Sequence, residues 1–85
     1  MELRFTTSFE SDYKKIIKSN DLLKRKITKQ FELLRSNINH PSLRLHKLAG
    51  GLFWSISIDK SVRALIIIEK KWIYVYHIGK HEDVY

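Results

Sequence analysis

The 85-residue chain is 44 % hydrophobic and 29 % charged, which is typical of a folded domain and excludes a disordered chain. Sixteen Lys and Arg against nine Asp and Glu give a formal net charge of +7, which favours a polyanionic partner such as nucleic acid. The absence of cysteine excludes disulfides, cysteine-based zinc sites and thiolate catalysis. We expect residues 1–85 to form a single domain.

The N-terminal segment has no apolar run resembling a signal peptide. The longest apolar stretch, residues 64–68, is too short to span a bilayer and is followed by three charged residues. We therefore expect a cytoplasmic protein without membrane association.

The first half of the chain predicts a short strand at residues 2–6 and then two helices. Ser8 is the expected N-cap of the first helix, because Glu10 and Asp12 follow in the first turn, where negative charge suits the helix dipole. Residues 19–21 mark a break with a second cap. Apolar residues recur at helical spacing on both sides of the break: Phe9, Tyr13, Ile16 and Ile17, then Leu23, Ile27, Phe31, Leu34 and Ile38.

The second half predicts strands. Pro41 ends helical structure within a loop at residues 37–42, and beyond it the hydrophobic period falls to two. Residues 53–58, 62–68 and 72–78 read as strands, separated by turns at 59–61 and 70–71. Gly50 and Gly51 are expected to turn the chain between residues 45–48 and the first of these strands.

This order predicts an α+β fold: an N-terminal strand, a two-helix hairpin and a three-stranded antiparallel meander. The helices would cover one face of a curved, mainly antiparallel four-stranded sheet. Leu65 and Ile67 would share the other face with Arg63, because side chains alternate along a strand. Apolar groups on an open face indicate that a partner covers it, unless the curl of the sheet or the C-terminal segment does so.

Four segments in this order resemble the RelE/ParE superfamily of toxins, most closely its RelE and YafQ-like branch. They are LRLHKLAGG at residues 43–51, WSISI at 54–58, VRALII at 62–67 and IGKHEDVY at 78–85. The resemblance implies a RelE-like domain that cleaves mRNA, often in the ribosomal A site. It also implies a cognate antitoxin with an acidic toxin-binding segment, and a toxin–antitoxin complex that binds operator DNA.

Cleavage of RNA without a metal requires a base for the ribose 2′-OH, positive charge at the phosphate and an acid for the leaving oxygen. Arg63 is the strongest site candidate, because it is a charge inside the most apolar strand and its guanidinium can hold two phosphate oxygens. The resemblance places there an arginine that contacts the scissile phosphate. The alternative is a salt bridge from Arg63 to Glu69 or Asp59.

Three further residues are predicted to be catalytic. His81 lies where the family places a catalytic His or Arg and is favoured as general acid, and His46 is a candidate base. Tyr85 matches the family's closing aromatic, which would stack on a base or orient the 2′-OH. The alternatives are exposed histidines in a turn and a loop, and a tyrosine packed against the sheet edge. Since Asp59 and Arg63 stand where some YafQ-like members carry His and Asp, the assignment of acid and base stays open.

The residues expected to contact RNA are Arg44, Lys47, Lys60 and Lys80. We expect no cofactor and no metal site, because His77 and His81 lie on a strand and a turn, where their spacing does not bring them to one face.

Two other functions remain open from the sequence. A ParE-like member would inhibit DNA gyrase without catalysis, and an inactive homologue would only pair with an antitoxin and DNA. Titratable His46 and His81 near Arg63 favour the nuclease, because a pure binding protein does not need them.

Overall fold

The computed structural model describes residues 1–81. The elements in chain order are β1 (Glu2–Phe5), α1 (Thr7–Ile16), α2 (Asp21–Ser36), the short helix η1 (Pro41–Leu43), β2 (His46–Lys47), β3 (Trp54–Ser57), β4 (Val62–Ile68) and β5 (Trp72–Lys80). The strands form one sheet in the order β1-β5-β4-β3-β2. In it β1 runs parallel to β5, and all other neighbours are antiparallel.

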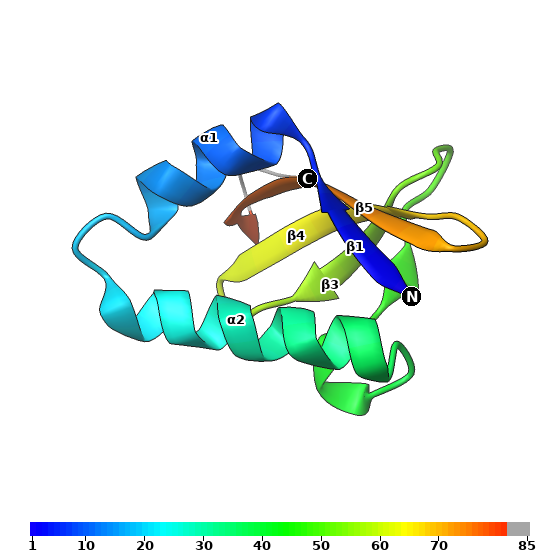
Figure 1. Ribbon diagram of the computed structural model, residues 1–85, viewed down its shortest axis with the longest axis horizontal. Coiled ribbons are helices and arrows are strands. Elements are labelled where there is room, and N and C mark those ends of the chain that lie inside the picture. The colour runs from blue at the N-terminus through cyan, green and yellow to red at the C-terminus, as the bar shows by residue number, and fades with distance from the viewer. Residues whose placement is uncertain (82–85) are drawn as a thin grey trace.

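The predicted α+β architecture is confirmed. Figure 1 shows α1 and α2 as two arms joined by a turn at one end, with the sheet visible between them. The sheet has five strands rather than the predicted four, because His46 and Lys47 pair with β3 and form a short strand of their own. Two residues are too few to produce a visible period in the sequence, so β2 escaped prediction.

Caps define both helices, and one of them differs from the prediction. The predicted cap at Ser8 is wrong, because Thr6 caps α1: its hydroxyl oxygen accepts a hydrogen bond from the Phe9 N–H at 3.1 Å. The same hydroxyl donates to the Tyr76 carbonyl of β5 at 3.0 Å, so Thr6 couples the start of α1 to the sheet. The predicted cap of the second helix is confirmed at Asn20, whose side-chain oxygen accepts from the Leu23 N–H at 3.0 Å.

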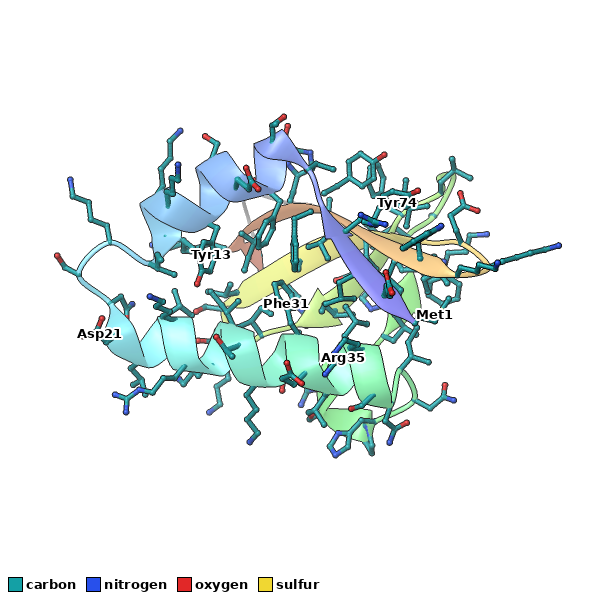
Figure 2. All side chains as sticks on the ribbon, in the orientation of Figure 1. Met1, Tyr13, Asp21, Phe31, Arg35 and Tyr74 are labelled. Atoms are coloured by element: carbon teal, nitrogen blue, oxygen red, sulfur yellow. The ribbon has the colours of Figure 1, made fainter. Side chains whose placement is uncertain are left out.

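The core lies between the helices and one face of the sheet. Ile56, Ala64, Ile66, Ile73 and Val75 line that face and are fully buried. The helices contribute buried Phe9, Leu23, Ile27 and Leu34. Figure 2 shows Tyr13 and Phe31 between the helices and the sheet, next to this core. Each fully buried side chain of this size stabilises the fold by roughly 1.5–3 kcal/mol.

The opposite face of β4 carries Arg63, Leu65 and Ile67, as predicted from strand alternation. Leu65 is only 8 % exposed and Ile67 is partly buried. The large hydrophobic residues exposed within residues 1–81 are Met1, Phe5, Leu22 and Leu52, all outside this set. The expectation that Leu65 needs a partner to cover it is therefore wrong, since the chain buries it already.

None of the helices in residues 1–81 combines the length and the apolar character needed to cross a bilayer.

Candidate active site

A basic cleft lies beside the free edge of β3, between α2 and the segment that follows η1. It has a volume of about 410 Å³. Five cationic side chains and one carboxylate are among its lining residues, which are Lys26, Lys29, Gln30, Ser42, Arg44, Ser57, Ile58, Asp59, Lys60 and Arg63. Such an excess of positive charge in a concave surface attracts an anion.

Arg63 has buried nitrogen atoms that lack partners. Its Nε and Nη1 are inaccessible to solvent and have no hydrogen-bond partner among residues 1–81. Its direct cross-strand neighbours, Ser57 on β3 and Gly79 on β5, have small side chains or none. A buried donor without a partner costs about 1–3 kcal/mol, and more when it is charged. The fold thus holds a guanidinium with unused donors beside the cleft, as a site for an anion requires.

The alternative of an ion pair from Arg63 to Asp59 is not realised within residues 1–81. One Asp59 oxygen accepts from the N–H groups of Ser61 and Val62 at 2.9 and 2.8 Å, and the other lies 3.8 Å from Lys26 Nζ. Partial burial raises the pKa of Asp59, but these N–H groups and the Lys26 ammonium outweigh it, and the pKa lies below its ordinary value. Asp59 is therefore a carboxylate whose oxygens interact with the backbone of the β3–β4 turn and with Lys26.

Gln30 connects the walls of the cleft. This residue of α2 is buried, and its Nε2 donates to the Ser57 carbonyl at 2.9 Å and to the Ser42 carbonyl at 3.2 Å. The two carbonyls belong to β3 and to the segment after α2. A single side chain thus fixes the distance between the strand that flanks Arg63 and the loop that leads to Arg44.

Arg44 has a left-handed backbone, with φ 46° and ψ 45°, at the end of η1. This conformation costs a residue with a Cβ roughly 1–2 kcal/mol, and glycine would adopt it freely. Arg44 therefore adopts an unfavourable backbone conformation where η1 ends, in the wall of the basic cleft.

The sequence matches no protein-family model, and no curated protein matches it. Solved structures do match over nearly the whole chain. A chain of the Escherichia coli DinJ–YafQ toxin–antitoxin complex has a TM-score of 0.82 at 14 % identity, covering 99 % of this chain and 96 % of that one. A YoeB/ParE toxin from Agrobacterium tumefaciens has 0.80 at 19 %, covering 95 % and 99 %. A copper-bound mutant toxin from Helicobacter pylori has 0.77 at 18 %, covering 100 % and 99 %.

The chain has the RelE-like toxin fold. This confirms the resemblance predicted from the four sequence segments, at the level of the fold.

Within the RelE-like fold, the two predicted histidines lie on either side of Arg63. The backbone N–H of His81 donates to the Ser61 carbonyl at 2.7 Å. His81 lies two residues after Gly79, which is the cross-strand partner of Arg63. His46 on β2 is exposed and in register with Ser55, and its Nδ1 lies 3.4 Å from the Arg44 carbonyl. Strand spacing and rise place the Cα of His81 about 8 Å and that of His46 about 12 Å from the Cα of Arg63. The sheet register thus brings both histidines to the neighbourhood of Arg63.

The four residues predicted to bind RNA line three different hollows of the surface. Arg44 and Lys60 line the basic cleft. Lys47 borders a separate hollow with residues 48–52. Lys80 pairs with Val62, so its side chain leaves β5 on the side opposite to Gly79, and it lines a second cleft near α1. Tyr85 lies outside the described residues.

No group of three or more His, Cys, Asp or Glu side chains suited to a metal ion occurs in residues 1–81.

Sequence reasoning missed three lining residues that come from α2, namely Lys26, Lys29 and Gln30. The lysines are two among many on the helices, and nothing in the sequence distinguishes them. Gln30 carries a weak signal, because it stands where the apolar stripe of α2 would place a buried residue, between Ile27 and Leu34.

Proposed function

We propose that this chain is a toxin of the RelE/YafQ type, an endoribonuclease that cleaves mRNA on the ribosome and is held inactive by an antitoxin. The observation that carries the proposal is the buried, unpartnered guanidinium of Arg63 beside a cleft lined by four other cations. The RelE-like fold supports it, because YafQ and YoeB/ParE toxins share that fold.

The proposed reaction is attack of a ribose 2′-oxygen on the adjacent phosphorus. The attacking hydroxyl gives up its proton to a base, the P–O5′ bond breaks, and the leaving 5′-oxygen takes a proton from an acid. The products are a 2′,3′-cyclic phosphate and a 5′-hydroxyl. Arg63 would neutralise the charge that builds up on the phosphate oxygens, with Arg44 and Lys60 holding neighbouring phosphates. His81 is the proposed acid and His46 a candidate base.

The proposal extends to partners. The DinJ–YafQ complex pairs a toxin of this fold with an antitoxin. For the present chain we propose a cognate antitoxin whose acidic segment complements the net charge of +7. The complex would bind operator DNA.

Induced expression followed by mapping of transcript 5′ ends tests the nuclease. We expect new ends within codons, 5′-hydroxyl termini, and loss of cleavage by about 10²–10³-fold in Arg63→Ala. Arg25→Ala is the matched control, because it removes an exposed arginine of α2 outside the cleft and should leave cleavage unchanged. Cleavage retained in Arg63→Ala would contradict the assignment of Arg63.

The same experiment separates the other functions. Intact transcripts with DNA damage would indicate a ParE-like gyrase inhibitor, and intact transcripts without growth arrest would indicate an inactive homologue. Cleavage of purified mRNA with and without ribosomes tests ribosome dependence.

A further inference from the structure

A histidine–aspartate pair lies on the other side of Arg63 from the basic cleft. β1 pairs with β5 only as far as Val75, so beyond that residue the outer edge of β5 runs along α1. There the Nδ1 of His77 lies 3.2 Å from the Oδ2 of Asp12 on α1. Both side chains line a second cleft.

The carboxylate fixes the imidazole ring in one orientation. Asp12 Oδ2 also accepts the Ile78 N–H at 3.4 Å, so the aspartate is itself held by the backbone of β5. A hydrogen bond from Nδ1–H to a carboxylate selects the tautomer in which Nε2 carries the lone pair. Nε2 has no hydrogen-bond partner within residues 1–81. The pair therefore presents an oriented proton acceptor at a partly exposed position.

The sheet register places His77 near Arg63. His77 is the direct cross-strand partner of Leu65, and Arg63 is the partner of Gly79, so His77 and Arg63 are diagonal neighbours. Such neighbours lie about 7–8 Å apart on one face, within reach of long side chains. His46 is two strands away from Arg63, whereas His77 is on the adjacent strand.

The cleft around His77 is also suited to RNA. The charged residues that line this cleft together with His77 are Asp12 and Lys15 from α1 and Lys80 from β5, while β4 contributes the apolar Leu65. Gly79 lines the same cleft and pairs with Arg63, so a strand bound at Arg63 can extend toward His77.

We propose that His77, oriented by Asp12, accepts the proton of the attacking 2′-hydroxyl. In this step the proton moves to Nε2, the 2′-oxygen bonds to phosphorus, the P–O5′ bond breaks, and the 5′-oxygen takes a proton from the acid. Asp12 stabilises the imidazolium that results. The inference rests on the proposed nuclease function and names His77, rather than His46, as the base.

Steady-state cleavage of mRNA on purified ribosomes tests this assignment. We expect His77→Gln to lower kcat by about 10²-fold or more with KM within twofold, because only proton transfer is lost. Asp12→Asn should also lower kcat, because the imidazolium loses its counter-charge, but it should lower kcat no further in the His77→Gln background. Asp21→Asn, an exposed aspartate of α2, is the matched control.

The outcomes separate the two proposals. If the wild-type chain cleaves, Arg63→Ala does not, and His77→Gln keeps kcat, the role of His77 is refuted and the nuclease stands. If the wild-type chain cleaves no RNA, both proposals are wrong. If Asp12→Asn lowers kcat by the same factor in the wild-type and His77→Gln backgrounds, Asp12 does not act through His77 and is only structural.

Binding to the wild-type chain gives a readout that needs no variant to fold. In nitrogen-detected NMR of histidine-labelled protein, a nucleoside 3′-monophosphate, which keeps the 2′-hydroxyl beside the phosphate but has no following nucleotide to release, should perturb the Nε2 resonance of His77. An unperturbed Nε2 at saturating nucleotide would overturn the proposal.

Discussion

The two faces of β4 carry side chains with opposite effects on stability: apolar core residues on one face and Arg63 on the other. Val62, Ala64 and Ile66 face the helices and are buried in the apolar core. Arg63, one residue from Val62 and Ala64, faces the other way with two buried nitrogen atoms that bind nothing in residues 1–81. The core residues lower the free energy of the fold, whereas Arg63 raises it. Such a cost within an apolar strand supports the proposed role of Arg63 at a ligand site.

The largest effect on stability is expected on the helix side. Ile66→Ala should lower the free energy of unfolding by about 2–5 kcal/mol, because Ile66 is fully buried and the cavity cannot collapse. Ile67→Ala makes the same change at the next residue, which is only partly buried, and should cost clearly less. Urea unfolding measures both. Equal losses of unfolding free energy in the two variants would contradict the assignment of the core to the Ile66 face.

A substitution at Arg63 is expected to stabilise the fold rather than destabilise it. Arg63→Met keeps most of the side-chain volume and removes two buried donors without partners, so it should raise the free energy of unfolding by about 1–3 kcal/mol. Cleavage should be lost in the same protein. A variant that is less stable than the wild-type chain in urea would show that the guanidinium is satisfied in the fold and does not await a ligand.

A smaller effect is expected where β1 passes into α1. Thr6→Ala should cost about 1 kcal/mol, because the Phe9 N–H loses its acceptor and the Tyr76 carbonyl loses its donor. Ser8→Ala is the matched control and should change the free energy of unfolding little, since Ser8 is exposed and lies within the helix. Thermal unfolding of the two variants distinguishes the observed cap from the one predicted from sequence.

The smallest effect is expected at Asp59, a cleft residue that does stabilise the fold. Because its pKa is lower in the folded chain, its contribution is present above the ordinary value of 3.8 and is lost as pH falls through the folded pKa. Asp59→Asn should therefore cost under about 1 kcal/mol at pH 7. This difference from the wild-type chain should shrink below pH 3.8. A constant difference from pH 7 down to pH 2 would contradict this account.

Hydrophobic periodicity was sufficient to predict most of the fold. The predicted strand at residues 62–68 has the bounds of β4, and the helices and their order are confirmed. Two local features were predicted wrongly. The strand β2 was not predicted because it has too few residues to show a period. Thr6 rather than Ser8 caps α1, and its hydroxyl also donates to β5. That second contact depends on tertiary structure, which the sequence of the cap does not reveal.

The candidate site was predictable only in part. Arg63 could be selected because a charge in an apolar strand is conspicuous in the sequence. The sequence marks Gln30 only weakly and the His77–Asp12 pair not at all, since their partners lie 12, 27 and 65 residues away in the chain. The roles of His46, His81 and Tyr85 remain predictions.

The anion site at Arg63 is tested most directly by nitrogen-detected NMR of its guanidinium during titration with inorganic phosphate. We expect the Nε–H resonance of Arg63 to shift more than those of Arg25 and Arg35, because only Arg63 holds buried donors without partners in residues 1–81. An Nε–H of Arg63 that stays unchanged, or that shifts no more than those two exposed arginines, would contradict it.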